Sequence, residues 1–187
     1  MNVLSHFESK GNIELLSQTT LAIFASKNTP SEIFQQAREI FLQLCSLPLS
    51  LCGGWQAALE KELLSLTHPQ MAADILLYSA KDLAKINLNE TLKNLDMFGK
   101  LLLLSAESRS DRVSKNDVDK RDDLLFKHMD KVLFMFIESG GRLEKYYNQL
   151  VKKNFPVFIL DHPLNKNFIS PGTVALNKEN IIDLGVS

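Results

Sequence analysis

The stretch KVLFMFIESGGRLEKYYNQLVKK, residues 131–153, decides the fold. It begins with a short, strongly apolar run, residues 131–137, which is typical of a strand that is covered on both faces. Two glycines follow, and apolar residues then recur at helical spacing up to about residue 153. This order predicts a buried strand, a tight turn and an amphipathic helix that packs against the sheet.

The same alternation extends from this stretch in both directions. Further strands are predicted at residues 21–25, 48–52, 73–80, 100–106, 156–160 and 173–176, and helices at residues 31–47, 55–66, 89–99 and 177–184, with another that ends near residue 128. Asn89 is the expected N-cap of one helix, and Gly99 is its expected end. Continuous apolar strands separated by helices imply parallel pairing. Right-handed crossovers then give a doubly wound α/β fold, with a mostly parallel sheet and helices on both faces.

The 187 residues fit a single domain. Residues 1–20 form a lead-in segment, and residues 105–119 are polar and charge-mixed, which predicts a mobile surface loop. The formal net charge is −1, so a phosphate site has to be a local patch on a neutral background. No apolar run approaches the ~20 residues that cross a bilayer, so we expect a cytoplasmic protein without a membrane partner.

Few residues suggest metal, redox or cofactor chemistry. Cys45 and Cys52 lie in apolar surroundings and are expected to be buried, reduced thiols. No CxxC or HExxH pattern occurs, so no metal site is expected. No GxGxxG or Walker motif occurs either, and no cofactor is expected. Asp161 and His162 follow a predicted strand, but no nucleophile is placed to act with them.

Candidate ligand-binding residues stand where the predicted strands end, because open α/β sheets bind ligands beyond the carboxyl ends of their strands. Glycine turns let the backbone approach a ligand there, and helix N-termini present free amides to anions. The candidate phosphate- or nucleic-acid-binding residues are Ser26, Lys27, Gly53, Gly54, Arg121, Gly140, Gly141 and Arg142. Simpler interpretations stay open: the glycine pairs can be plain tight turns, and Arg121 can pair with a neighbouring acid. Trp55 can pack against the sheet or stack on a base.

Five segments, taken in order and spacing over nearly the whole chain, resemble the Rossmann-like core of the DNA-processing protein A (DprA/Smf) family. Two of them, residues 73–108 and 171–184, are similar to its N-x-x-L helix with the flanking strands and to its closing strand and helix. KGNIELLSQTTLAIFASKNTPS, residues 10–31, is similar to that family's K-G-N-x-E-L-L lead-in and the strand that ends in G-S-R. LSLCGGWQAALEKELL, residues 49–64, lies where the family has S-G-x-A-x-G-I-D. Residues 120–160 resemble its R-N-R segment, its S-G-T turn and the strand that follows.

The chain also departs from this pattern at three places. The family's G-S-R is replaced by residues 25–27, ASK, which lose the glycine and keep a cation. Its R-N-R is replaced by residues 121–123, RDD, and a carboxylate in a phosphate groove is expected to add repulsion and weaken salt-dependent binding. Its S-G-T turn is replaced by residues 140–142, GGR.

The resemblance implies a protein that binds single-stranded DNA and hands it to a RecA-type recombinase during DNA uptake or recombination. Lys27, Arg121 and Arg142 would then contact phosphates, and the glycines would offer backbone amides.

Two other functions stay open beside it. ESGGRLEK, residues 138–145, also resembles a shortened turn of the lysine-decarboxylase-like phosphoribohydrolases, with Glu144 near the place of the catalytic carboxylate. The chain would then bind or cleave a nucleoside monophosphate, although binding is favoured over catalysis. A scaffold with a decayed pocket is the third interpretation. An apolar patch that supports a homodimer, or that packs on the sheet instead, could be formed by Tyr146, Tyr147, Leu150 and Phe155.

Overall fold

The computed structural model describes residues 7–106 and 113–184. The strands are β1 (Phe7–Gly11), β2 (Thr20–Ala25), β3 (Ser50–Gly53), β4 (Asp74–Ser79), β5 (Leu101–Ala106), β6 (Lys131–Phe136), β7 (Val157–Leu160) and β8 (Thr173–Leu176). The α-helices are α1 (Phe34–Leu44), α2 (Ala58–Ser65), α3 (Glu90–Met97), α4 (Lys115–His128) and α5 (Arg142–Lys152). Short 3-10 helices are η1 (Ile13–Ser17), η2 (Ser31–Ile33), η3 (Leu83–Lys85), η4 (Pro163–Phe168) and η5 (Ile181–Leu184).

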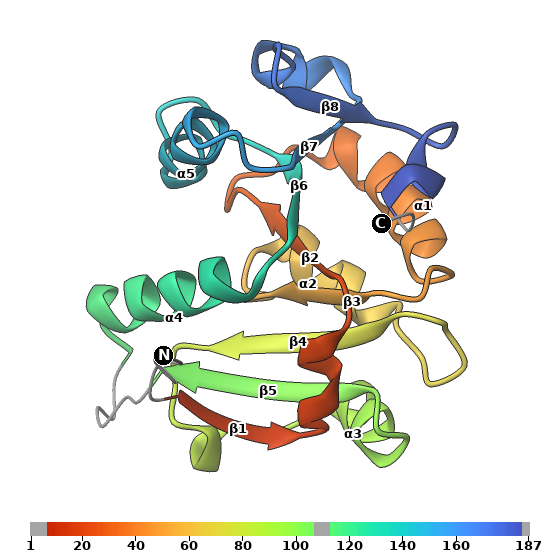
Figure 1. Ribbon diagram of the computed structural model, residues 1–187, viewed down its shortest axis with the longest axis vertical. Helices are drawn as coiled ribbons and strands as arrows, with labels where there is room; N and C mark the ends of the chain where they lie inside the picture. The colour runs from red at the N-terminus through yellow and green to blue at the C-terminus, as the bar shows by residue number, and fades with distance from the viewer. Residues whose placement is uncertain (1–6, 107–112, 185–187) are drawn as a thin grey trace.

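The strands form one sheet in the order β1-β5-β4-β3-β2-β6-β7-β8 (Figure 1). β1 runs antiparallel to β5, and the other neighbouring strands are parallel. From β2 the chain builds the sheet outward through β3, β4 and β5, and it then returns to the other side of β2 to add β6, β7 and β8. The direction of winding therefore reverses between β2 and β6, and such a reversal leaves a crevice beyond the carboxyl ends of the two strands.

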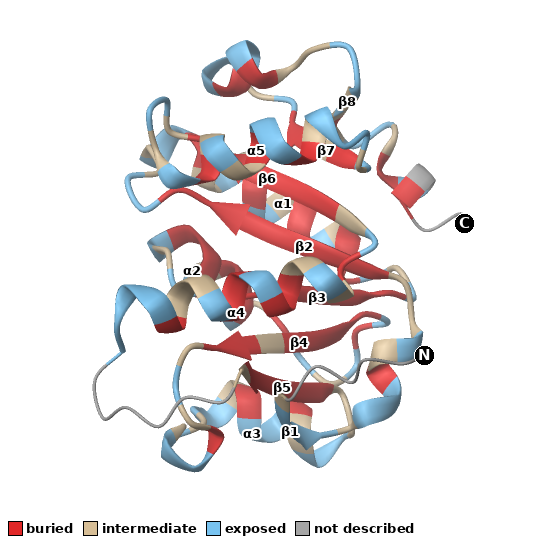
Figure 2. Ribbon diagram, turned by 60° about the vertical axis from the view of Figure 1, so that its left-hand side comes forward, coloured by how far each residue is buried: buried red, intermediate tan, exposed pale blue. Residues whose placement is uncertain are grey.

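Helices cover both faces of the sheet, and each face has its own apolar core (Figure 2). Within β2, Leu21 and Ile23 belong to the core under α1, α2 and α3, whereas Phe24 belongs to the core under α4 and α5. Successive side chains of a strand point to opposite faces, so a strand between two helix layers has to be apolar throughout. The predicted doubly wound fold and the parallel pairing are confirmed.

One strand was not predicted, and two expectations at the ends of elements were wrong. Residues 7–11 of the lead-in form β1, an edge strand that is mostly exposed and therefore carries no apolar run. The predicted loop at residues 105–119 is shorter, because residues 105 and 106 belong to β5 and α4 begins at Lys115. Ser114 and Asp117 cap that helix reciprocally, and its first turns are too polar to show periodicity. Residues 107–112 of the expected loop lie outside the described residues. The terminal helix is only the short η5.

Other local expectations agree with the structure. The Asn89 side chain accepts a hydrogen bond from the N–H of Leu92 at 2.9 Å and so caps α3. Gly99 follows the end of the helix with φ +70°, a conformation that favours glycine. Within residues 7–106 and 113–184, no helix is long and apolar enough to span a bilayer.

Candidate functional site

A cleft of about 320 Å³ lies at the reversal of winding, beyond the carboxyl ends of β2, β3 and β6. We call it the switch-point cleft. Its lining residues are Phe24, Ala25, Ser26, Lys27, Gly54, Gln56, Ala57, Glu60, Arg121, Glu138, Arg142 and Leu143. Five of the eight residues predicted from the sequence thus lie together in one cavity: Ser26, Lys27, Gly54, Arg121 and Arg142.

The two arginines of the cleft are held by one buried carboxylate. Asp122 Oδ1 accepts hydrogen bonds from Arg121 Nε at 2.8 Å and Nη2 at 2.5 Å, and its Oδ2 lies 3.0 Å from Arg142 Nη1. The Asp122 side chain is 0% exposed, that of Arg121 is 7% exposed and that of Arg142 is 45% exposed. A guanidinium has five N–H donors, so each arginine still presents donors that Asp122 does not take. Asp122 therefore orients the cations from behind and does not face the cavity as a repelling charge.

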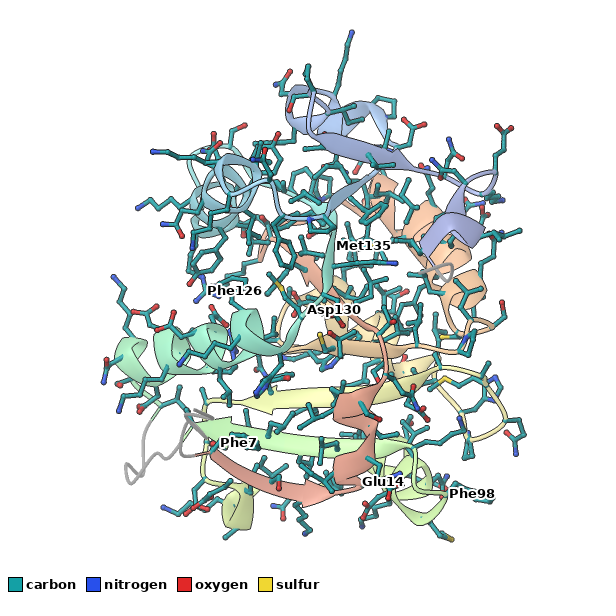
Figure 3. The ribbon with its side chains drawn as sticks, in the orientation of Figure 1. Phe7, Glu14, Phe98, Phe126, Asp130 and Met135 are labelled. Carbon is teal, nitrogen blue, oxygen red and sulfur yellow. The ribbon has the colours of Figure 1, made fainter. Side chains whose placement is uncertain are left out.

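Two aromatic side chains support Arg142 in this position. The hydroxyl of Tyr146 donates to Asp122 Oδ2 at 3.1 Å, and the guanidinium of Arg142 lies 5.6 Å from the centre of the Tyr146 ring. Phe126 projects from α4 toward α5 (Figure 3) and meets the Tyr146 ring edge to face, with the ring centres 4.8 Å apart. Burial, and then the charge of Asp122, raise the pKa of Tyr146 to about 12, so its hydroxyl stays a donor.

Glu60 joins the ends of β2 and β3 beneath the cleft. Its Oε1 accepts from the N–H of Ala25 at 3.0 Å, and its Oε2 accepts from those of Gln56 and Ala57 at 2.7 and 3.2 Å. Burial raises the pKa of Glu60, while the three N–H groups and the charge of Arg121 act in the opposite direction. This residue was not predicted. Glu60 is the third residue of α2, three positions after the N-cap residue Ala57. A glutamate at this position often accepts a hydrogen bond from the backbone N–H of the N-cap, and this was the available signal.

Gly54 is required by the close approach of Arg121. A Cβ atom at this position would lie 2.8 Å from both Cζ and Nη1 of the Arg121 guanidinium. A larger residue would therefore displace the cation that Asp122 holds. The hydroxyl of Ser26 accepts from the N–H of Glu138 at 2.9 Å, which ties the end of β2 to the end of β6.

The comparisons with known proteins bear on the fold. No family model matches the sequence, and no curated protein matches it. Among solved structures, DNA processing protein A (DprA) from Streptococcus pneumoniae matches 95% of this chain with a TM-score of 0.72 at 14% identity, and this chain spans 65% of that one. The DprA of Helicobacter pylori, described as having a unique single-stranded DNA binding mode, matches 95% of this chain and 83% of its own, with a TM-score of 0.71 at 16% identity.

The chain has the fold of DprA. The same architecture is shared with the molybdenum cofactor carrier protein of Chlamydomonas reinhardtii, which matches 91% of this chain and 100% of its own, with a TM-score of 0.60 at 10% identity. Identities this low show the fold alone, and one fold can serve different ligands. The function has to be inferred from the residues of the cleft.

Three predicted glycines of the DprA-like fold lie outside the lining of the cleft. Gly53 ends β3 and packs against β2, where an added Cβ would lie 3.2 Å from the carbonyl oxygen of Ile23. The N–H of Gly141 donates to the carbonyl of Glu138 at 3.0 Å, and the N–H of Gly140 donates to the carboxylate of Glu144. Both amides are thus bonded within the turn that starts α5. Glu144 caps that turn.

Several open alternatives are decided by burial. Trp55 is 2% exposed and its indole N–H donates to the carbonyl of Leu76 at 3.2 Å, so the interpretation of a base-stacking tryptophan is wrong. Cys45 and Cys52 are buried free thiols, and burial raises the pKa of both, so neither is an activated nucleophile.

The proposed apolar surface patch is also wrong. Tyr147 and Leu150 are buried in the core under α5, and Tyr146 and Phe155 are partly buried against that core. These side chains therefore pack on the sheet.

Proposed function

We propose that this chain binds single-stranded DNA through the switch-point cleft. The observation that carries the proposal is the pair of guanidinium groups of Arg121 and Arg142, which Asp122 fixes side by side at the reversal of the sheet. Charge-assisted bonds from a preorganised arginine to a phosphate are among the strongest in proteins, and they recognise the backbone of a strand and not its sequence. Lys27 adds a third cation at the end of β2.

The neighbours in fold support this choice of ligand. One of them, the H. pylori DprA, is described as binding single-stranded DNA, and it superposes on nearly the whole chain. A role in DNA uptake or recombination, with transfer of the strand to a RecA-type recombinase, extends the same proposal.

A mononucleotide is the second candidate, and the size of the cavity favours it. A volume of about 320 Å³ lies at the small end of the range for small-molecule sites. Cleavage of such a ligand has less support, because the carboxylate of Glu144 is bonded to Gly140 and that of Glu60 to three N–H groups.

The test is a titration of fluorescein-labelled oligo-dT at low salt, read by anisotropy. The double variant Lys27→Ala/Arg142→Ala is compared with Lys152→Ala/Lys166→Ala, which removes the same charge from two exposed lysines that lie outside the cleft lining. We expect the first variant alone to weaken binding, with the slope of log K against log salt reduced by about 0.7 for each phosphate contact that is lost. An absence of binding at micromolar protein, or equal losses in both variants, would refute the proposal. Binding of dTMP and not of oligo-dT would favour the mononucleotide.

A further inference from the structure

A second and larger cavity, of about 780 Å³, adjoins the switch-point cleft beyond the ends of β3 and β4. It lies between α2, the segment that follows β4, and the start of α4. The two cavities share three lining residues, Gln56, Arg121 and Arg142, so a ligand can pass from one to the other without leaving the protein surface. We call the second cavity the lysine groove and define it by Lys61, Lys81, Lys85, Leu77, Ile86 and Asn87.

The charge of the lysine groove differs from that of the cleft. Asp122 lies behind Arg121 and Arg142, which line both cavities, and the cleft has Glu60 and Glu138 beside its cations in addition. The lining of the groove, within the described part of the chain, holds three lysines and the two shared arginines and no Asp or Glu. Lys61 and Lys81 add positive charge to the shared arginines in the groove, whereas Glu60 and Glu138 offset the cations of the cleft, so a chain of phosphates is expected to be attracted more strongly to the groove.

The groove also has an apolar floor. Leu77 of β4 and Ile86, which follows η3, are only partly buried and line the cavity, and Asn87 and Gln56 add carboxamides that can donate and accept hydrogen bonds. An apolar surface beside a few polar groups suits a nucleobase, whose faces are apolar and whose edges form hydrogen bonds.

The segment that carries Lys81 is anchored to the sheet. The N–H of Lys81 donates to the hydroxyl of Ser79 at 2.9 Å, and its carbonyl accepts from the hydroxyl of Ser105 at 2.8 Å. The backbone of Lys81 is thus fixed to the ends of β4 and β5, so the cation reaches the groove from a defined point.

We propose that the lysine groove is a second nucleotide subsite, and that the ligand is a single-stranded oligonucleotide which places a phosphate in the switch-point cleft and a neighbouring nucleotide in the groove. The inference rests on the proposed function, because it extends a strand that is already bound at the cleft. It also separates the two candidate ligands, since a mononucleotide would leave the groove without an occupant.

The experiment compares dTMP, short oligo-dT of increasing length, and an eight-nucleotide strand in which abasic sites replace the thymines. Each is titrated by calorimetry against the native protein, Lys61→Ala/Lys81→Ala and the control Lys152→Ala/Lys166→Ala. Ile86→Ala tests the apolar floor, and thermal melts confirm that each variant folds. We expect affinity to rise about tenfold or more from dTMP to the four-nucleotide strand, because each buried base adds to binding. The Lys61→Ala/Lys81→Ala variant should lose that gain and keep its affinity for dTMP.

The outcomes separate the inference from the proposed function. Equal affinity for dTMP and longer strands, or equal behaviour of the lysine variant and its control, would overturn the subsite and leave binding at the cleft intact. Equal affinity for the abasic and normal strands would also overturn it, because the groove would then hold no base. If neither dTMP nor any strand binds, the proposed function fails first and the subsite fails with it.

Discussion

The substitution Asp122→Asn tests whether a buried carboxylate organises the site. Asp122 accepts from Arg121 through Oδ1 and from Tyr146 through Oδ2, and Oδ2 also pairs with Arg142. An asparagine has the same shape but carries no charge, and its NH₂ group would face a donor whichever way the amide is turned. The change therefore leaves the Arg121 guanidinium buried beside a neutral group.

The expected loss of stability follows from the burial of the Arg121–Asp122 ion pair. Removing one partner of a buried ion pair costs about 3–5 kcal/mol, because the other charge is left without compensation. For a domain of this size the melting temperature should fall by about 6–20 °C. Binding of oligo-dT should weaken as well, since both arginines lose their common anchor. If only the net charge mattered, binding of oligo-dT would become tighter, because a negative charge has been removed from beside the proposed phosphate site.

The assay pairs thermal unfolding with the anisotropy titration, and the neighbouring Asp123→Asn is the control. Asp123 is exposed on the same helix and loses the same charge. A second variant, Arg121→Met/Asp122→Leu, replaces the pair by apolar residues and should recover most of the stability while binding stays weak. An Asp122→Asn protein that is as stable as the native one, or that binds oligo-dT more tightly than Asp123→Asn does, would refute this role of Asp122.

Three more substitutions test other contacts. Gly54→Ala places a Cβ against the Arg121 guanidinium, so we expect about 1–3 kcal/mol of destabilisation in a denaturant titration and a weaker affinity for oligo-dT; an unchanged affinity would contradict a role for Arg121. Glu60→Gln turns an NH₂ group toward backbone N–H donors that both carboxylate oxygens now serve, so the free energy of unfolding should fall by about 1–3 kcal/mol, and a neutral result would contradict this. Burial, and then the charge of Lys127, lower the pKa of His128, so the unfolded state binds the proton more tightly and stability is lost as pH falls below the unfolded value of about 6.5, by at most about 1.4 kcal/mol per pH unit. His128→Gln should remove this part of the pH dependence when unfolding is measured between about pH 7.5 and 5.5, and parallel curves for the two proteins would count against it.

The sequence predicts the central part of the fold because buried parallel strands leave an unmistakable pattern. β5 and β6 are buried on both faces of the sheet, so their residues are apolar almost without interruption. β1 has no such pattern, because it lies at the edge of the sheet with four of its five residues exposed. The start of α4 also cannot be recognised from the apolar pattern of the sequence, because the buried pair Leu124 and Leu125 comes late in the helix.

The site is only partly predictable, because a sequence places residues at strand ends and does not show which way their groups point. Lys27, Arg121 and Arg142 could be expected near one sheet edge, and the structure places them in one cavity. The sequence does not show that the N–H groups of Gly140 and Gly141 are already bonded and so not free to bind a phosphate, because their partners are set by the geometry of the turn. The lysine groove was missed since its cations come from α2 and from the segment after β4, neither of which carries a motif.

The separation of charge over the surface would let a chain with a net charge of −1 bind a polyanion, as we propose. In the switch-point cleft the cations are matched by carboxylates, and this balance fixes geometry more than it attracts phosphates. The described lining of the lysine groove adds Lys61 and Lys81 to the two shared arginines and holds no Asp or Glu, so more of the attraction is expected there. A ligand confined to the cleft gains orientation and little attraction, whereas a strand that continues into the groove gains both. We therefore expect affinity to depend on salt and on the length of the strand before it depends on sequence.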